Sequence, residues 1–422
     1  MPISTEHPIE YYEWLDQQKF IDTPDKDVRD VVMSELQLFR SMEQREYILF
    51  MKWDKLRKIY SEPSRELQER IKNVQDNIWV PKKPEDYLKL QPEVVYIQQQ
   101  FPIRRVSIWG NESFLSLSNP SNLSLDWTIL GDFLSTGDPT ASTPGRTLSF
   151  LVRDKKTKKY LGILSLASDY LEIKERDTEI GWSREQRGNG KRIQYTAVGK
   201  VIVPTQPLGY SYVGGKLLSL LLTSEPVCKI WEEVYGSKLA GITTTSLYGN
   251  QKSSTQYDGL KPYWFNLGQS AGASSFKLSS ENDNMMREWM KTKYPYDYWM
   301  HYVGTKENGM PLMRSARDRG RQFCYKKLNI PSSEYTSNHQ RGVYFSKLYE
   351  DSYLFLQGKI NEKALTTKRF DNSTENLVEL WKTKYAAKRV KSLIENNNFS
   401  FESSFYSELP SLSWDETKER FL

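Results

Sequence analysis

Apolar residues recur every three or four positions along the first part of the chain, between residues 24 and 79. The series runs from Val32 to Ile59 with charged residues between its members, which is the spacing of one helical face. Residues 62–64 interrupt it, and Ser64 is placed to cap a second helix that carries Leu67 and Ile71. We predict a helical hairpin that covers a sheet. An oligomerising coiled coil is the alternative, although the heptad pattern is not sustained.

The middle of the chain carries strand patterns. Residues 147–154 and 160–166 are apolar runs joined by a lysine-rich turn, and they predict a hairpin. Another apolar run at 193–203 ends at prolines, a leucine-rich helical segment follows at 208–222, and a β-branched run lies at 242–245. This order predicts an α+β fold with a mixed sheet flanked by helices. It has the outline of an acyl-CoA-dependent N-acyltransferase core, the GNAT-like fold.

The remaining regions differ in composition from this core. Residues 81–146 are rich in Pro, Ser and Asn, which predicts an irregular, exposed connection. Residues 331–422 return to a helical pattern and finish in a polar tail. We therefore expect a helical N-terminal region at 1–80, the connection at 81–146, the core at 147–330 and a helical C-terminal extension at 331–422.

Composition narrows the chemistry. The chain has 422 residues, a net charge of +6, two cysteines and three histidines. The cysteines and histidines are too few and too scattered for a zinc site, so we expect no metal. No apolar stretch approaches the roughly 18 residues of a membrane span, so we expect a reduced, cytoplasmic protein without a membrane partner. The positive charge favours a polyanion such as nucleic acid without requiring one.

A glycine-containing segment follows the strand at 193–203. Closely spaced glycines before a helix can expose backbone N–H groups to the pyrophosphate of a cofactor, and a lysine adds positive charge. The segment predicts an acyl-CoA site formed by Gln206, Gly209, Gly214, Gly215 and Lys216. Tight packing of a leucine-rich helix is the alternative, because the glycine spacing departs from the usual acyltransferase loop.

Candidate acid–base groups lie on both sides of this segment. We expect a strand near Trp182 that presents Asp177 and Glu179 on one face, where partial desolvation raises a carboxylate pKa and favours a general base. Tyr257 is the candidate acid that protonates a leaving thiolate. The alternatives are a surface salt bridge among Arg176, Glu179 and Arg184, and a tyrosine that belongs to the core.

Two basic stretches interleave with aromatic residues after the core. This combination is typical of phosphate contact and base stacking, whereas a solvated helix face is the alternative. The first stretch predicts a nucleic-acid surface that consists of Arg314, Arg317, Arg319 and Arg321. The second contains Lys382, Lys384, Lys388, Arg389 and Lys391.

An ordered series of short motifs spans residues 146–280. It comprises Val-Arg-Asp at 152–154, Ile-Gly-Trp-Ser at 180–183, Trp231 with Tyr-Gly at 235–236, and Tyr257 with Trp264, Leu-Gly at 267–268 and Gly272. The series resembles the DruA-like domain found in Druantia anti-phage systems and mobile elements. One departure is the family's Asn-Asn-Ser/Thr-Arg-Phe strand, which here reads Gln-Tyr-Thr-Ala-Val at 194–198, so roles of those family residues do not transfer. The order of elements also looks like the Mom-type phage proteins that modify adenine in DNA.

The resemblance implies a bacterial or phage setting and leaves two functions open. The first is an acyltransferase-like enzyme that modifies DNA, another nucleic acid or a cytosolic amine. The second is a non-catalytic DNA-binding or defence-complex subunit that keeps the fold. The irregular glycine segment favours the second function, and the grouping of Asp177, Glu179 and Tyr257 favours the first.

Overall fold

A seven-stranded mixed sheet forms the centre of the molecule. The computed structural model describes residues 7–97, 122–135, 145–247, 255–270, 274–304, 314–337, 340–398 and 409–422. The strand order is β1-β2-β3-β4-β5-β9-β6. The bounds are β1 Pro92–Ile97, β2 Thr147–Asp154, β3 Tyr160–Ser168, β4 Thr196–Pro204, β5 Gly241–Ser246, β6 Phe265–Gln269 and β9 Gly342–Lys347. The expected α+β fold with a mixed sheet is confirmed.

The strand pairing explains why the sheet is mixed. Strands β1 to β4 are antiparallel neighbours, and β2 with β3 forms the predicted hairpin. The β4–β5 pair is parallel, since the helices α8 (Leu208–Tyr212), α9 (Gly214–Leu221) and α10 (Glu225–Tyr235) connect the two strands. Strand β9 lies antiparallel between β5 and β6.

The helices α8 and α9 pack on the strands that precede them. The prolines at 204 and 207 end β4 and the helix follows at once, as predicted. Leu217, Leu218 and Leu221 have no exposed surface and belong to the core cluster that also contains Leu164 and Ile202 of the sheet. Burial of these leucines fixes the position of the glycine segment at the start of α9.

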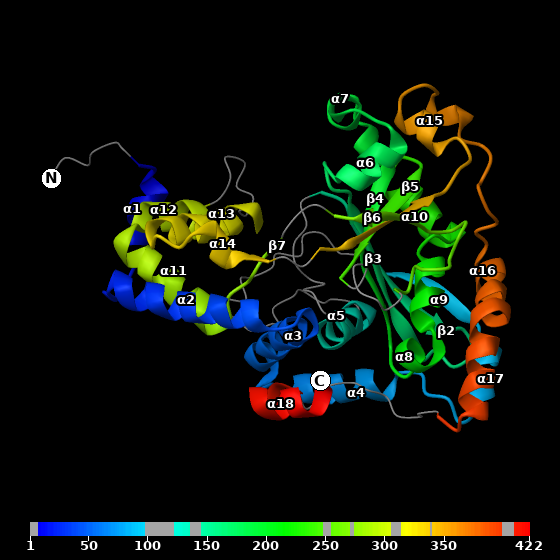
Figure 1. Cartoon of the computed structure of the whole chain (residues 1–422), viewed down its shortest axis with the longest axis horizontal. Helices are drawn as coiled ribbons and strands as arrows, with labels where there is room; N and C mark the ends of the chain where they lie inside the picture. The colour runs from blue at the N-terminus through cyan, green and yellow to red at the C-terminus, as the bar shows by residue number, and fades with distance from the viewer. Residues whose placement is uncertain are drawn as a thin grey trace.

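A second core lies on the opposite side of the sheet. Leu151, Ile163 and Val201 of β2, β3 and β4 cluster there with residues from several helices. These helices are α2 Asp25–Ser41, α3 Gln44–Tyr60, α4 Arg65–Asp76, α5 Asn122–Leu134, α11 Ser280–Lys293 and α13 Arg314–Lys327. Helices α2, α11 and α13 form a lobe beside the sheet (Figure 1).

The N-terminal helices match the sequence pattern in part. Ser64 caps α4 as predicted, because its hydroxyl accepts a hydrogen bond of 3.3 Å from the Leu67 N–H. The predicted single helix before it is two helices, α2 and α3, which meet near Met42. The apolar face of α2 is buried against α11 and other elements of the same chain.

The remaining elements cover the two cores. The helical ones are α1 Ile9–Leu15, η1 Pro84–Lys89, α6 Lys174–Ile180, α7 Arg184–Arg187, η2 Arg192–Tyr195, α12 Pro295–Tyr298, η3 Trp299–Val303, α14 Ser332–Tyr335, α15 Ser352–Leu356, η4 Glu362–Ala364, α16 Thr374–Leu380, η5 Trp381–Ala386, α17 Ala387–Glu395, η6 Leu409–Ser411 and α18 Trp414–Phe421. A separate two-stranded sheet joins β7 (Ser274–Ser275) and β8 (Thr336–Ser337). No described helix has the length and apolar character that a membrane crossing requires.

Two local predictions were wrong. The region 81–146 is not uniformly irregular, since β1 is an outer strand of the sheet and α5 is largely buried, with the Trp127 Nε1 donating to the Phe150 carbonyl at 3.1 Å. The apolar residues of 122–134 pack against the sheet, and this burial favours a helix despite the Ser and Asn content of the region. The segment that carries Asp177 and Glu179 is the helix α6 rather than a strand.

Candidate functional site

Strands β4 and β5 separate from each other after a short paired stretch. Parallel pairing is limited to residues 196–198 of β4 and 241–243 of β5. Beyond it the Thr244 Oγ1 donates to the Gly199 carbonyl at 3.0 Å, and the Gln256 Nε2 donates to the Ile202 carbonyl at 3.2 Å. The Gly199 and Ile202 carbonyls of β4 are therefore satisfied by side chains of the same chain.

Tyr257 lies inside this gap. It is in a turn rather than in the expected helix, and only 6% of its surface is exposed. The Gln256 Nε2 donates to its hydroxyl at 2.9 Å, and its ring lies 5.3 Å from that of Trp264. Burial raises the pKa of Tyr257 above its ordinary value, although the hydrogen bonds of its hydroxyl with Thr244 and Gln256 act in the opposite direction. A raised pKa makes this tyrosine a weaker proton donor.

The turn that holds Gln256 and Tyr257 is tied to the sheet by Asp258. One carboxylate oxygen of Asp258 accepts from the Thr255 N–H at 2.6 Å, and the other accepts from the Tyr344 hydroxyl of β9 at 3.0 Å. The Tyr344 hydroxyl also accepts from the Thr255 Oγ1 at 2.9 Å. These bonds hold the turn against the open end of β4 and β5.

The predicted acyl-CoA residues are packed against their neighbours. A Cβ added at Gly209 would lie 2.6 Å from the Gln206 Nε2, and one added at Gly214 would lie 2.8 Å from the Leu208 carbonyl oxygen. At Gly215 the added Cβ would lie 2.6 Å from the Gln256 Oε1. These glycines permit close packing within the chain, as the packing alternative expects, and the acyl-CoA site stays a prediction.

Lys216, another of the predicted acyl-CoA residues, also has partners within the chain. Its ammonium donates to the Asp258 carbonyl, and it lies 5.5 Å from the centre of the Tyr385 ring. Burial lowers the pKa of Lys216 below its ordinary value. The lysine therefore connects α9 to the same turn that fills the strand gap.

The two predicted carboxylates have different surroundings on α6. The Asp177 Oδ1 accepts from the Trp182 Nε1 at 2.9 Å and from the Arg176 Nη2 at 2.7 Å. Its Oδ2 accepts from the Ile173 N–H at 3.1 Å and lies 3.4 Å from the Arg187 Nη1. Both oxygens are thus occupied within the chain.

Glu179 lies on the exposed side of α6, apart from Asp177. It accepts a hydrogen bond of 3.2 Å from the Tyr353 hydroxyl. The alternative of a surface salt bridge through Arg176 was wrong, because Arg176 is fully buried, and the exposed pair at this position joins Arg184 to Glu172 at 3.1 Å.

Asp169 is the residue at this end of the sheet that sequence reasoning missed. It directly follows β3, and its side chain is fully buried. The carboxylate lies 2.8 Å from the Arg176 Nη1 and accepts from the Thr243 Oγ1 of β5 at 2.8 Å. Desolvation by burial raises the pKa of Asp169, and the adjacent Arg176 counteracts this shift. A carboxylate at the end of a buried strand was the signal available in the sequence.

Comparison with known proteins identifies the family. The model of the family described as Druantia protein DruA matches residues 135–358, which is more than half of the chain. The chain belongs to the DruA family. The Druantia protein DruA of Escherichia coli (strain UMEA 4076-1) is 25% identical to it over 244 residues, which cover 54% of this chain and 57% of that protein. No solved structure matches the chain.

The DruA family match includes the whole strand gap and the Asp169–Arg176 pair. It confirms the DruA-like resemblance, while the Mom-type resemblance stays a prediction. The match begins before β2 and ends after β9, so β1 and the helices from α16 onward lie outside it.

The predicted arginine surface on α13 also lies within the DruA region, and its members differ. Arg321 is tied to the lobe, because its Nε lies 2.7 Å from Asp283 and its Nη1 lies 2.9 Å from Asp318. Arg319 is exposed. Side-chain positions of Arg314 and Arg317 lie outside the described part of the structure. The α13 surface stays a prediction, with Arg321 as the member that also has a structural role.

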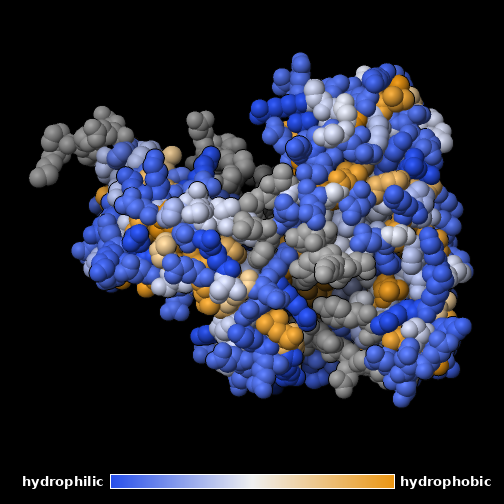
Figure 2. Space-filling model, in the orientation of Figure 1, coloured by the Kyte–Doolittle hydropathy of each residue, from blue (hydrophilic) through white to orange (hydrophobic). Residues whose placement is uncertain are grey.

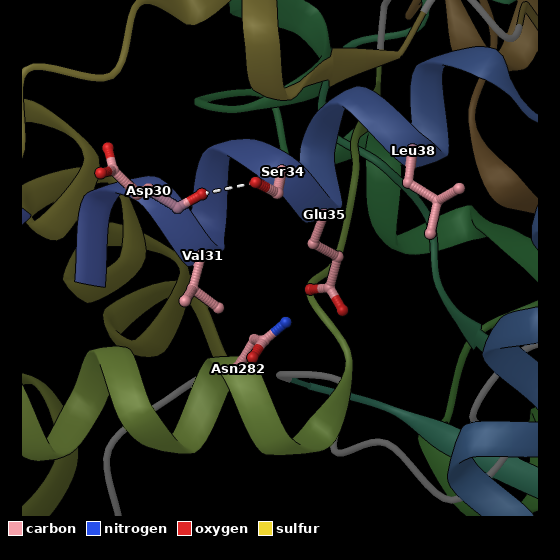
Figure 3. Close-up of a pocket in the computed structure, with 6 residues that line it drawn as sticks. All are labelled: Asp30, Val31, Ser34, Glu35, Leu38 and Asn282. Carbon is pink, nitrogen blue, oxygen red and sulfur yellow. Dashed lines mark hydrogen bonds between the residues drawn. The ribbon is translucent and has the colours of Figure 1, made fainter. Parts of the chain in front are cut away.

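A shallow hollow on the helical lobe is separate from the sheet. It lies between α2 and α11 and is lined by Asp30, Val31, Ser34, Glu35, Leu38 and Asn282 (Figure 3). One Glu35 carboxylate oxygen accepts from the Ser279 N–H at 3.0 Å. Glu35 thus helps to begin α11, which gives its carboxylate a structural explanation. Among the described residues, no group of His, Cys, Asp and Glu is arranged to hold a metal ion.

Proposed function

We propose that this chain is a nucleic-acid-binding subunit of an anti-phage defence system, in which the mixed sheet is a scaffold rather than an acyl-CoA enzyme. Membership of the DruA family supports the defence role. The match spans 57% of the Escherichia coli relative, so the partners of this chain are part of the proposal.

The filled gap between β4 and β5 is the observation that carries this choice. An N-acyltransferase needs free carbonyls and amides along that gap to receive the pantetheine arm. Here Thr244 and Gln256 occupy the carbonyls of Gly199 and Ile202. A chain that satisfies its own strand edge in this way has a stable sheet and no ready-made cofactor cleft.

The charge distribution supports nucleic acid as the ligand. The net charge is +6, and Figure 2 shows a largely hydrophilic face with scattered apolar patches. Exposed lysines at 384, 388 and 391 follow one another along η5 and α17, and Arg319 and Lys326 are exposed on α13. Such cations release counterions when they meet phosphates, and the half-buried Tyr385 adds an aromatic face.

The first prediction tests the α13 surface. Replacement of Arg314, Arg317 and Arg319 by Glu should weaken duplex DNA binding and reduce the dependence of affinity on salt, because each lost phosphate contact removes about 0.9 from the slope of log K against log salt. Arg321 is left in place since it stabilises the lobe through Asp283. Fluorescence anisotropy with a labelled duplex at several salt concentrations measures both quantities.

A control with the same charge change separates the surface from the total charge. It carries Glu at Arg65, Lys72 and Lys229, which are exposed on α4 and α10. Equal weakening in both triple variants would remove α13 from the proposal. A loss confined to a variant with Glu at Lys384, Lys388 and Lys391 would assign the contact to α17 instead. Absence of DNA binding by the unmodified chain at low salt would overturn the proposed function.

An acyltransferase-like DNA-modifying enzyme is the second candidate, and the separation of β4 from β5 is the observation that favours it. This function requires the turn at 255–258 to leave the gap. Asp177 or Glu179 would then be the base, Tyr257 the acid, and Gln206 with the glycines of α8 and α9 the cofactor contacts. The hydrogen bonds of Asp258 to Thr255 and Tyr344 oppose that movement.

A further inference from the structure

A cavity of about 230 Å³ lies at the paired end of β4 and β5. Its walls come from segments that are distant in the sequence: Arg146 precedes β2, Ser168 ends β3, Gln194 is in η2 and Ser237 follows α10. Only the folded chain brings these residues together.

Arg146 is the cationic group of the cavity. Its guanidinium carbon lies 4.5 Å above the Trp231 ring and 5.5 Å from the Tyr235 ring, and the side chain is half-buried. Its Nη1 donates to the Gln194 carbonyl and its Nη2 donates to the Thr196 carbonyl at 3.4 Å. A guanidinium has five N–H donors, so donors remain for a ligand.

One buried group in the cavity wall and another beneath Arg146 have no hydrogen-bond partner among the described residues. The Ser237 hydroxyl lines the cavity, is 7% exposed and has no hydrogen-bond partner. The Trp231 indole N–H, beneath Arg146, is fully buried and also lacks one. Leaving such groups unsatisfied costs about 1–3 kcal/mol each. A ligand with acceptor atoms would recover that cost at Ser237, which lies in the cavity wall.

Two other polar side chains in the wall, those of Tyr235 and Asp169, already have partners. The Tyr235 hydroxyl donates to the Thr147 carbonyl at 2.9 Å and accepts from the Thr147 N–H at 2.8 Å. The Asp169 carboxylate is balanced by Arg176 and bonded to Thr243. The unused hydrogen-bonding capacity is therefore mainly that of donors next to a cation, which is complementary to an oxyanion.

We propose that this cavity binds a phosphate group, carried either by the end of a nucleic-acid strand or by a free nucleotide. The wall's donors by themselves indicate an oxyanion. The preference for phosphate over carboxylate rests in addition on the proposed nucleic-acid function. The volume accommodates a phosphate with part of the group that carries it, and is below the roughly 300 Å³ typical of pockets for larger ligands.

The test is calorimetry on the full chain with inorganic phosphate, acetate, AMP, and oligonucleotides that have a 5′-phosphate or a 5′-hydroxyl. Charge-assisted hydrogen bonds predict about tenfold weaker phosphate binding in Arg146→Met and about fivefold weaker binding in Ser237→Ala. Arg184→Met is the control, because Arg184 is exposed on α7. Ser237→Ala removes a hydroxyl without a partner, so this variant keeps the test valid if Arg146→Met fails to fold.

Equal phosphate affinity in the unmodified chain, Ser237→Ala and the Arg184→Met control would overturn the proposal, as would absence of phosphate binding. Acetate binding with the same dependence on Ser237 but no phosphate binding would also overturn it. Tighter binding of the 5′-phosphate strand than of the 5′-hydroxyl strand assigns the ligand to nucleic-acid ends, and a preference for AMP assigns it to nucleotides. A further outcome is that phosphate fails to bind while DNA binding depends on salt and is equally tight for the 5′-phosphate and 5′-hydroxyl strands. In that case the cavity proposal fails and the proposed function stands.

Discussion

The two ends of the β4–β5 pair differ in what fills the space beside them. At the paired end, the buried Asp169–Arg176 ion pair supports the strands, and an open cavity with the unpartnered Ser237 hydroxyl in its wall lies next to it. At the separated end, Thr244, Gln256 and Tyr257 fill the gap and satisfy the strand carbonyls. The sequence pattern assigned the cofactor contacts and the acid Tyr257 to the separated end, where Gln256 and Lys216 instead form hydrogen bonds within the chain.

This difference shows which structural signal points to a ligand. A gap between strands is weak evidence for a ligand site when side chains of the same chain bridge it with hydrogen bonds. Buried donors without partners are rarer, because most buried polar groups in proteins are hydrogen-bonded. The paired end has such groups at Ser237 and Trp231, whereas Thr244 and Gln256 bridge the separated end, so a ligand is expected at the paired end.

The largest effect should come from the ion pair at the paired end. Arg176→Met leaves the buried Asp169 without its cation and removes two hydrogen bonds from Asp177. Loss of one partner of a buried pair costs about 3–5 kcal/mol of the free energy of unfolding. Urea denaturation measures this change. Arg184→Met makes the same chemical substitution at an exposed position and should change stability by less than about 0.5 kcal/mol.

Adjacent threonines of β5 allow the two ends to be compared directly. Thr243→Val removes a hydrogen bond to the Asp169 carboxylate, and Thr244→Val removes one to the Gly199 carbonyl. Bonds to charged groups contribute about 1.5–3 kcal/mol and neutral ones about 0.5–1.5 kcal/mol, so Thr243→Val should be the more destabilising. Both threonines are buried, and both changes keep the side-chain shape. The reverse order in urea denaturation would mean that the separated end is the more strongly stabilised.

The smallest effect is expected at Tyr257. Tyr257→Phe removes one hydroxyl that accepts from Gln256, while Gln256 keeps its bond to the Ile202 carbonyl, so stability should fall by less than about 1 kcal/mol. A general acid would instead lose about two to four orders of magnitude in rate. Mass spectrometry of nucleosides from bacteria that express each protein checks this. A DNA adduct that requires the Tyr257 hydroxyl would favour the enzyme.

The local sequence pattern was sufficient to predict those elements in which apolar residues follow a single helix or strand spacing. The hairpin at β2–β3 and the passage from β4 into α8 were both predictable because apolar runs end at turn residues and prolines. Helix α6 was misread as a strand since alternate carboxylates suggested a period of two. The buried residues of α6 are Arg176 and Ile180, four apart, which is the helical spacing. A charged residue at one of those positions concealed the helical pattern.

The site depended on contacts that spacing does not encode. Asp169, Arg176 and Thr243 come from the end of β3, from α6 and from β5, and only the sheet order brings them together. Gln256 reaches the Ile202 carbonyl from a turn that follows β5 in the sequence. Glycines at 209, 214 and 215 were recognisable as sites of close approach, but the sequence alone leaves open whether a cofactor or the chain itself approaches.

Hydrogen exchange with acetyl-CoA or duplex DNA tests the proposed function most directly, because it locates each ligand on the chain. We expect DNA to protect peptides from 314–327 or 381–395, and acetyl-CoA to leave exchange in 196–204 and 255–260 unchanged. That result fits a nucleic-acid-binding subunit whose strand gap is filled by its own side chains. Altered exchange at 196–204 and 255–260 with acetyl-CoA, together with no protection by DNA, would contradict it and favour the enzyme.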